Sequence, residues 1–466
     1  MPEPTYSPRL RTAIVFCGAG TAGAYQAGAL RALTEAGIKV DVMAAHGAGV
    51  ATALCGAIDG GARLWSPDGP WQSPRLRAAY RWREALRLGG FGLLAAALLI
   101  VSPLLIMVFA AAVYAIALLA ALINLQDVSA RLVDLFRWSI SILFSPPILP
   151  TIVPRSVVLA LLVVLGILVT AAVKAMRQER SRRRWQGSFW WHLVGSPLEP
   201  DEPENLLVDA LWALVRGAST EPRPPSAEIG RRYVDLLTDN FGQPGFRGLL
   251  IAVHDLDARR DLVGTVMPPE MHVPMAARRK GPGPREAELF DLTGIQKELV
   301  VDFLKGAVRL PVASAPHVMQ FPTESFWRGE SHRLCDRPEL PARLIEEMAT
   351  AGIEQVVLIG PAPPAAVPHG MRSKPLDLRS RMGEVLRSIE TAALHDAWNA
   401  ALTRFSGVFV IRPDHNPIGP FEFGGAYDEA SDRHRSLQEL LQQGYDDAYR
   451  QFIEPVAAVG ERVEAI

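Results

Sequence analysis

The sequence predicts an α/β domain that is interrupted by a hairpin of two membrane-spanning helices. Short apolar strands alternate with helix-like segments on both sides of the interruption, a pattern typical of a mostly parallel sheet covered by helices. Residues 93–123 contain no charged side chain, and this run exceeds the roughly 20 residues that cross a bilayer as a helix. The 466 residues also exceed the size at which one core usually stops growing, which fits a domain with an insertion.

Charge and cysteine content exclude several functional classes. The 48 basic and 49 acidic residues leave a formal charge of -1, which provides no general attraction to nucleic acid, so we expect no nucleic-acid partner. Cys17, Cys55 and Cys335 are odd in number and widely spaced, so the sequence indicates neither a disulfide framework nor a metal site. The first twelve residues lack the apolar core of a signal peptide, and we expect the N-terminus to stay in the cytoplasm.

The chain begins with two strand–loop–helix units. The predicted elements are strand 13–16, helix 24–36, strand 40–45 and a helix that starts at residue 50. Each strand runs into a glycine-rich segment, GAGTAG after the first strand and HGAG after the second. This order predicts two parallel strands that are connected by a helix.

The predicted insertion follows the second unit. A second apolar run, 157–173, is bounded by Arg155 and Lys174 and is near the lower length limit for a membrane span. The prediction divides the chain into a first part of the domain, the insertion and the remainder of the domain, at residues 1–72, 73–187 and 188–466, with helices at about 93–123 and 156–176. The alternative is a pair of buried core helices, although uncharged runs of this length are rare in soluble cores.

Arginines predict how the insertion crosses the membrane. Five precede the first apolar run and five, with Lys174, follow the second, whereas the loop 126–155 carries three. By the positive-inside rule, this distribution places the α/β domain in the cytoplasm and the loop outside, as in a multi-pass protein of the inner membrane. Part of the loop, residues 135–150 with Trp138, would lie in the interface or re-enter the bilayer. Interfacial anchoring and ordinary domain packing both remain open for Trp185, Trp190 and Trp191.

Beyond the insertion, strands and helices alternate again. Residues 196–228 are rich in proline and acid and predict a linker with one short helix at 206–215, and residues 268–284 predict a mobile surface loop. The predicted strands are 248–253, 355–359 and 408–411. The predicted helices are 296–308, 341–351, 378–405 and 437–452.

The glycine-rich loop at residues 18–23 has two interpretations. A GxGxxG pattern at a helix N-terminus is typical of dinucleotide binding, but the acidic residue expected at the end of the second strand is absent, since Asp41 falls inside that strand. Backbone N–H groups of Gly18, Gly20, Thr21 and Gly23 could instead form an oxyanion hole for ester hydrolysis. The small residues of AHGAGV then provide a sharp strand-to-helix turn, as a nucleophile elbow requires.

The phrases CGAGTAGAYQAGALRAL and AAHGAGVATAL together resemble the opening of the patatin-like phospholipases, in which a glycine loop precedes a GxSxG elbow. Weaker resemblance extends over VHDLD, PVASAPHVMQFP, LCD, PFEFGG and GYDDAY, so that residues 10–62 and 190–455 are covered. The resemblance implies a three-layer α/β/α domain with a Ser–Asp dyad whose aspartate is Asp336. The membrane hairpin is an insertion into this pattern.

Departures from the family pattern concern the reaction itself. The nucleophile position holds Gly47, which has no side chain and forms no acyl-enzyme. Asp336 is present, but Arg337 and Pro338 replace the glycines that the family has after it. A substitute nucleophile is not evident, since His46 would point away from the elbow tip, and Cys17, Cys55 and Ser314 are interpreted as packing or loop residues.

The resemblance therefore leaves more than one function open. The first is a membrane-anchored lipid acyl hydrolase whose catalysis is impaired or lost because Gly47 replaces the nucleophile, and the second is a pseudoenzyme that binds lipid or acts as a scaffold. A third, weaker alternative is a nucleotide-binding membrane protein. Membrane lipids are the expected partners, and no cofactor is expected.

Overall fold

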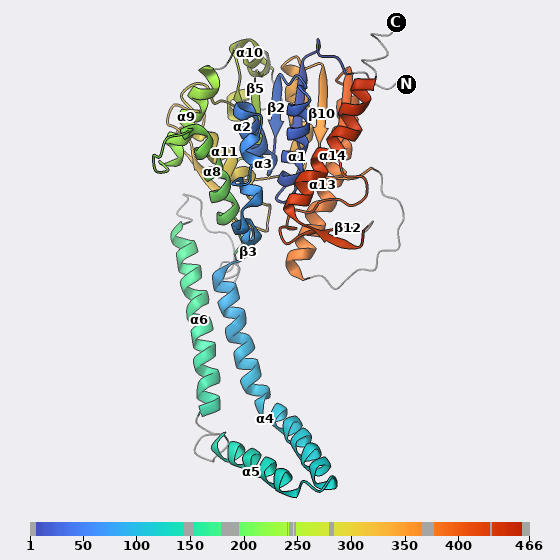
Figure 1. The fold of residues 1–466 in the computed structure, drawn as a ribbon. Helices are drawn as coiled ribbons and strands as arrows, with labels where there is room; N and C mark the ends of the chain where they lie inside the picture. The colour runs from blue at the N-terminus through green and yellow to red at the C-terminus, as the bar shows by residue number, and fades with distance from the viewer. Residues whose placement is uncertain are drawn as a thin grey trace. The chain divides into compact units, whose positions relative to one another are not determined.

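The computed structural model describes residues 6–143, 152–178, 195–239, 241, 246, 248–278, 284–364, 377–428 and 431–458. The chain divides into two compact units. One consists of Met1–Arg81 with Leu198–Ile466, and the other of Trp82–Pro197. Figure 1 shows the first unit as a sheet covered by helices and the second as long helices. The predicted interfacial tryptophans Trp185, Trp190 and Trp191 lie outside the described residues.

The first unit is built on a nine-stranded, mostly parallel sheet. Its main path runs in the order β11-β10-β1-β2-β5-β6-β7, and the first five of these strands are parallel. The predicted strands are present with small shifts, as β1 (Thr12–Phe16), β2 (Val42–Ala45), β5 (Gly248–Asp255), β10 (Gln355–Ile359) and β11 (Gly407–Ile411). They are short and almost entirely buried, which is why they appear in the sequence as continuous apolar runs.

Four further strands of this sheet were not predicted. They are β6 (Arg260–Val266), β7 (Leu289–Asp291), β8 (His317–Gln320) and β9 (Ser331–Cys335). β6 and β9 both pair antiparallel with β5, and β8 pairs with β9. Polar residues interrupt their apolar pattern because these strands lie where the parallel core gives way to a half-exposed edge. Two small separate sheets consist of β3 (Arg81–Trp82) with β4 (Leu198–Glu199), and β12 (Ala426–Asp428) with β13 (Arg433–Arg435).

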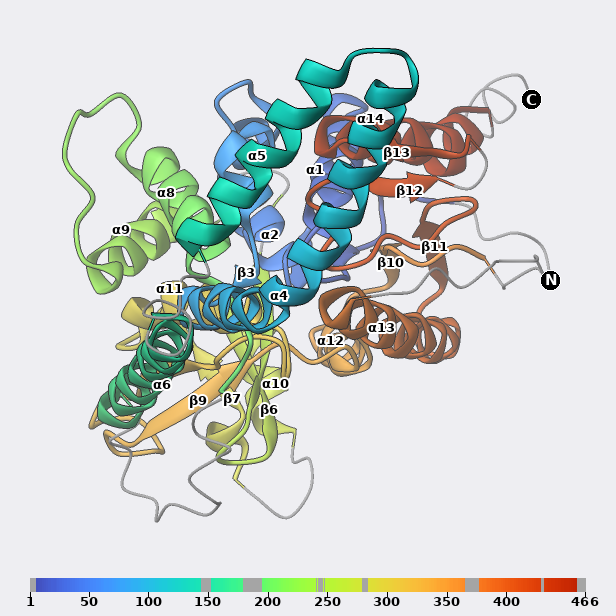
Figure 2. The same ribbon diagram turned by 90° about the horizontal axis from the view of Figure 1, so that it is seen from below.

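Helices cover both faces of the sheet, as expected for a three-layer fold (Figure 2). One face carries α1 (Ala22–Glu35), α2 (Gly49–Asp59) and α14 (Leu437–Ala448). The other carries α12 (Leu340–Thr350) and α13 (Leu378–Leu402), which share a core with β1, β2, β5 and β10. Smaller helices complete the unit, namely α3 (Ala62–Trp65), α10 (Pro269–Ala277) and α11 (Val300–Ala307).

The short helix predicted at 206–215 after the insertion is present as part of a longer helix, but the linker predicted around it is wrong. Residues 196–228 contain α8 (Asp201–Arg216) and the start of α9 (Ser226–Asp239). Both helices bury an apolar face, and acidic residues in the first turn of α8 stabilise its N-terminus instead of marking a solvated linker. The predicted loop 268–284 is also wrong over its first half, where α10 buries Met271 and Met275. Of its remainder, residues 279–283 lie outside the described residues.

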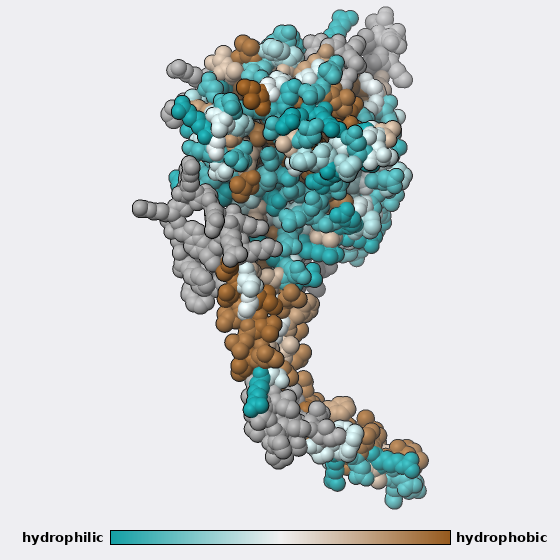
Figure 3. All heavy atoms as spheres, turned by 90° about the vertical axis from the view of Figure 1, so that its left-hand side faces the viewer, coloured by the Kyte–Doolittle hydropathy of each residue, from teal (hydrophilic) through white to brown (hydrophobic). Residues whose placement is uncertain are grey.

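The second unit consists of α4 (Glu84–Leu122), α5 (Gln126–Leu143) and α6 (Ile152–Gln178). Apolar side chains cover much of the surface along α4 and α6 (Figure 3). Two stretches of described helix, Glu84–Val101 and Leu104–Leu122, are long and apolar enough to cross a membrane, and both belong to α4. The apolar stretch of α6, Arg155–Ala171, is shorter. The predicted first span thus corresponds to the larger part of one longer helix.

Candidate functional site

The glycine at the nucleophile position forms the expected turn between β2 and α2. Gly47 has φ +58°, in the left-handed region that favours glycine, and α2 begins two residues later. The N–H of Ala48 donates to the Gly18 carbonyl at 3.0 Å, so the turn is attached to the end of β1. The local geometry is that of a sharp strand-to-helix elbow, but no side chain projects from its tip.

Asp336 lies beside this elbow. It follows β9, which is held against β5, and its N–H donates to the Arg309 carbonyl at 2.7 Å. Its carboxylate is almost completely buried, and Oδ2 lies 3.0 Å from the position that a Cβ atom on Gly47 would take. The structure therefore brings together the two positions that the family resemblance pairs, although Arg337 and Pro338 follow the aspartate.

His46 holds the Asp336 carboxylate from below the elbow. Its Nδ1 lies 3.0 Å from Asp336 Oδ1, and the Gly18 N–H donates to its Nε2 at 3.3 Å. The Gly18 N–H needs a free lone pair on Nε2, so the ring is neutral and carries its proton on Nδ1, toward Asp336. His46 thus points inward as expected, and it completes a buried pair.

Glu390 is a site residue that the sequence did not reveal. It lies on α13, is almost completely buried, and accepts a hydrogen bond from the Ala19 N–H at 3.0 Å. Burial raises its pKa to about 8. The sequence of α13 does make this glutamate stand out. The other buried positions on the same face of the helix are small and apolar, namely Gly383, Ala393, Ala397 and Ala401. A lone glutamate in such a face needs a partner, and here it finds one in the glycine loop.

The glycine loop is also closed by the loop before β12. The Thr21 N–H donates to the Pro420 carbonyl at 3.4 Å, and a Cβ atom on Gly20 would lie 2.0 Å from the same oxygen. The N–H groups of Gly18, Ala19 and Thr21 are thus all hydrogen-bonded within the chain. Of the residues expected to bind an oxyanion, Gly18 and Thr21 therefore have their N–H groups occupied, and the Gly23 N–H donates to the Gly20 carbonyl at 3.1 Å. The N–H of Gly20 makes no hydrogen bond among the described residues.

The other candidate nucleophiles lie in structural positions. Cys17 and Cys55 are buried free cysteines, and burial raises the pKa of both thiols, which disfavours the reactive thiolate. Ser314 is buried and donates its hydroxyl to the Leu310 carbonyl at 3.1 Å. Cys17 does lie beside a base, His46, but burial raises the thiol pKa by more than the hydrogen bond with His46 lowers it. Among the described residues, no group of three or more His, Cys, Asp or Glu side chains could hold a metal ion.

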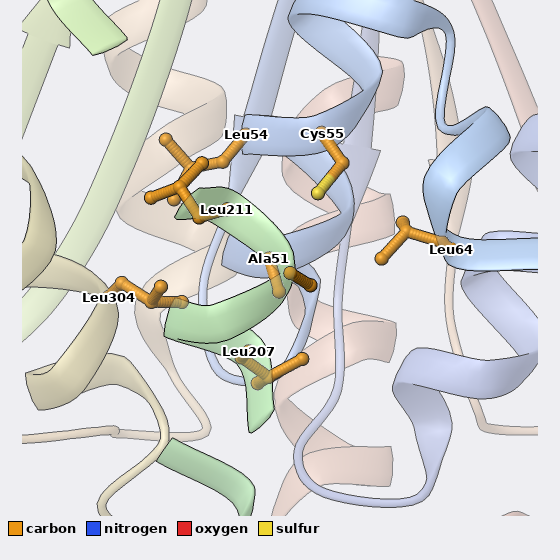
Figure 4. Close-up of a pocket in the computed structure, with 8 residues that line it drawn as sticks. Ala51, Leu54, Cys55, Leu64, Leu207, Leu211 and Leu304 are labelled. Atoms are coloured by element: carbon orange, nitrogen blue, oxygen red, sulfur yellow. The ribbon is translucent and has the colours of Figure 1, made fainter. Parts of the chain in front are cut away.

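A cluster of leucines under α2 is packing and not a ligand site. Leu54, Leu207, Leu211 and Leu304 converge there from α2, α8 and α11 (Figure 4). The space between them does not admit a water molecule. A larger hollow of about 390 Å³ lies at β12, β13 and α14, but its buried carboxylates, Asp428 and Asp447, are bonded to arginines of the same chain.

Comparisons with known proteins assign no function to this chain. The sequence matches no profile of a known protein family and no curated protein. Among solved structures, the chain is similar to VipD from Legionella pneumophila, at 9% sequence identity and a TM-score of 0.33. The alignment covers 96% of this chain and 67% of VipD. A likeness at that level carries no argument about chemistry.

Proposed function

We propose that the chain is a membrane-anchored, patatin-like domain that does not hydrolyse esters and acts as a lipid-facing scaffold. The observation that carries the proposal is the elbow itself. Gly47 keeps the left-handed backbone of a nucleophile elbow, and Asp336 lies 3.0 Å from its Cβ position, yet the attacking atom is absent. Acyl transfer through this site would need a side-chain nucleophile at the tip.

The surroundings of Gly47 support loss of function beyond one missing hydroxyl. A Cβ atom at this position would lie 2.6 Å from the Gly18 carbonyl oxygen, a distance that requires the backbone to shift. Two of the loop amides, those of Ala19 and Thr21, already donate to Glu390 and Pro420. The elbow is therefore packed for a glycine, and most of the loop amides are satisfied without a ligand, which the donors of a working oxyanion hole would not be.

The second unit supports the membrane part of the proposal. Its exposed side chains on α4 and α6 are large and apolar, whereas exposed leucines and isoleucines in water would be unfavourable in this number. By the positive-inside rule, the arginines that flank the apolar runs assign the α/β unit to the cytoplasmic side of the inner membrane. Membrane lipids are then the partners nearest to the chain.

A nucleotide ligand has less support. A pyrophosphate would need the same loop amides and a free helix N-terminus at α1. Ala19 and Thr21 donate to groups of the chain instead, and no observation at the end of β2 replaces the missing ribose-binding carboxylate.

Fluorophosphonate labelling and phospholipid ester turnover test the proposal directly. The wild type, Gly47→Ser and Gly47→Ala are compared in detergent, with an active serine esterase as the positive control. We expect no labelling and no turnover above the no-enzyme blank for the wild type. We also expect Gly47→Ser to remain inactive, because its Cβ meets the Gly18 carbonyl. Labelling and turnover by the wild type would overturn the proposal.

A further inference from the structure

Helix α4 is too long to be a single membrane span. Its 39 residues extend about 58 Å at 1.5 Å per residue. The hydrocarbon core is about 30 Å thick, and even at a tilt of about 40° the helix would rise about 45 Å. Only part of α4 can therefore cross the bilayer. The helix bends partway along (Figure 1), and Pro103, which lacks an N–H for the helix ladder, lies between its two apolar stretches.

Helix α6 identifies the part that crosses. It packs antiparallel against the first half of α4 (Figure 1), where a Cβ atom on Gly92 would lie 2.4 Å from Val164 Cγ2. With these two residues opposite each other, Arg155 is level with about Val101. The paired part from Glu84 to Val101 is 18 residues, or about 27 Å, which matches a bilayer core. Arg155 then marks the far boundary of the spanning pair.

The second half of α4 pairs with α5 instead. α5 runs back beside it (Figures 1 and 2). The ring of Phe136 is 5.9 Å from that of Phe109 and 6.1 Å from that of Tyr114, measured between centroids. Val113 and Ala117 of α4 are buried in this contact. We call Leu104–Leu122 and Gln126–Leu143 together the distal pair.

The distal pair has two chemically different faces. On its α4 side, every exposed large side chain is apolar, including Met107 at 70% exposure and Leu118 at 63%. On its α5 side, Asp127, Arg131 and Asp134 are exposed along a strip that lies opposite Phe136 on the helix. Figure 3 shows hydrophilic residues gathered again at the α5 end of this unit. One face therefore suits hydrocarbon, and the other suits water.

We propose that the distal pair lies in the plane of the membrane interface, in the leaflet opposite Arg83 and Arg87. The α4 half faces the acyl chains, and the charged strip of α5 faces the headgroups and water, with Trp138 at the boundary. If α5 crossed the membrane, four ionised residues would enter hydrocarbon, and each would cost about 2.5–3.5 kcal/mol near the bilayer centre. The inference rests on the membrane insertion that belongs to the proposed function.

Depth measurements on spin labels test this arrangement in the full chain. The protein is placed in lipid discs of phosphatidylcholine with phosphatidylglycerol, and single cysteines replace the exposed residues Leu94, Val101, Met107, Leu118 and Asp134. The native cysteines are buried, so the unsubstituted chain serves as the labelling blank. Depth is read from the relative accessibility of each label to oxygen and to a nickel chelate.

We expect the labels at 94 and 101 to differ in depth by about 10 Å, as in a helix along the bilayer normal. The labels at 107 and 118 are about 16 Å apart along α4 but should agree in depth within about 5 Å. The label at 134 should contact water. A steady change of depth from 107 to 118 would show a spanning helix and overturn the proposal.

The remaining outcomes separate this inference from the proposed function. Lipid contact at 94 and 101 with water at 107 and 118 would show that the distal pair leaves the bilayer, while the anchor stands. Shielding of 107 and 118 from both oxygen and nickel would show that a second copy covers the α4 face, which also overturns the interfacial position. Water contact at all five labels would refute membrane insertion, and with it the membrane part of the proposed function.

Discussion

The side chains of the elbow and those of the insertion differ in where they find their contacts. At the elbow, His46, Asp336 and Glu390 are buried, and each has a hydrogen-bond partner inside the chain. Among the described residues of the insertion, most large apolar side chains of α4 are exposed. A site that binds a polar ligand leaves hydrogen-bond donors free, and a surface that binds lipid leaves apolar area free. The contrast supports the proposal of an elbow that is closed to a reactant and an insertion that faces lipid.

Breaking the buried pair should have the largest effect on stability. His46→Ala leaves the Asp336 carboxylate buried and without the hydrogen bond from Nδ1, which costs about 3 kcal/mol of unfolding free energy because the unsatisfied group is charged. Asp336→Asn is the matched variant, since its side-chain oxygen can still accept the Nδ1 hydrogen, and it should cost less. Chemical unfolding in detergent, followed by tryptophan fluorescence, measures both. Equal and small losses would show that the elbow is not held by this pair.

A charge on the apolar face of the distal pair should have the next largest effect, on the free energy with which this pair binds lipid. Leu118→Asp exposes a carboxylate where we place acyl chains, and the cost at this shallow depth should be below the about 2.5–3.5 kcal/mol that applies at the bilayer centre. Ala130→Asp, on the water-facing side of α5, is the control and should be neutral. The measurement is the fraction of protein that floats with liposomes. If both variants float alike, the two faces of the distal pair do not differ as proposed.

Periodicity and charge were enough to predict the parallel strands, the main helices and the apolar insertion. The linker prediction for residues 196–228 failed where packing decided the structure, since α8 extends beyond the predicted helix 206–215 and, like α9, is ordered by the apolar face that it buries. At the site, short motifs identified Gly47, the glycine loop and Asp336. Glu390 lies 371 residues from Ala19, and only the fold brings a carboxylate to that amide. Residues 84–92 of α4 were missed because the predicted span was bounded by the uncharged run, whereas the helix begins earlier and includes Glu84 and Arg87.

Adding a side chain at the elbow should have a moderate effect. Gly47→Ala must adopt a left-handed backbone, at about 1–2 kcal/mol, and its Cβ must also displace the Gly18 carbonyl. We expect a loss of about 2–3 kcal/mol in unfolding free energy. Gly37→Ala is a control with φ +66° and open space around its Cβ, so it reports the backbone strain alone. Similar losses for both variants would mean that the elbow has room for a side chain.

Replacing Glu390 should have the smallest effect on the free energy of unfolding. We expect almost no effect at low pH and a larger one as pH rises. The folded-state pKa of Glu390 is raised to about 8 from 4.5, because burial disfavours the carboxylate. The folded state therefore holds a proton that the unfolded state releases between these two values, and folding loses stability as pH increases from about 4.5 to 8. The side-chain amide introduced by Glu390→Gln can still accept the Ala19 N–H through its oxygen but does not titrate.

Thermal unfolding of the wild type and Glu390→Gln is therefore measured at several pH values. We expect the difference between their midpoint temperatures to grow as pH rises. Near pH 5 their midpoints should be close, and by pH 8 the variant should be the more stable by about 1–3 kcal/mol, the cost of a poorly compensated buried group. Glu354→Gln, which removes a carboxylate that accepts the N–H of Arg11 near the surface, corrects for the general effect of losing a charge. A constant difference between wild type and Glu390→Gln across this range would mean that Glu390 is ionised in both states. The Ala19 N–H of the glycine loop would then donate to an ionised carboxylate of the chain, instead of to a protonated Glu390.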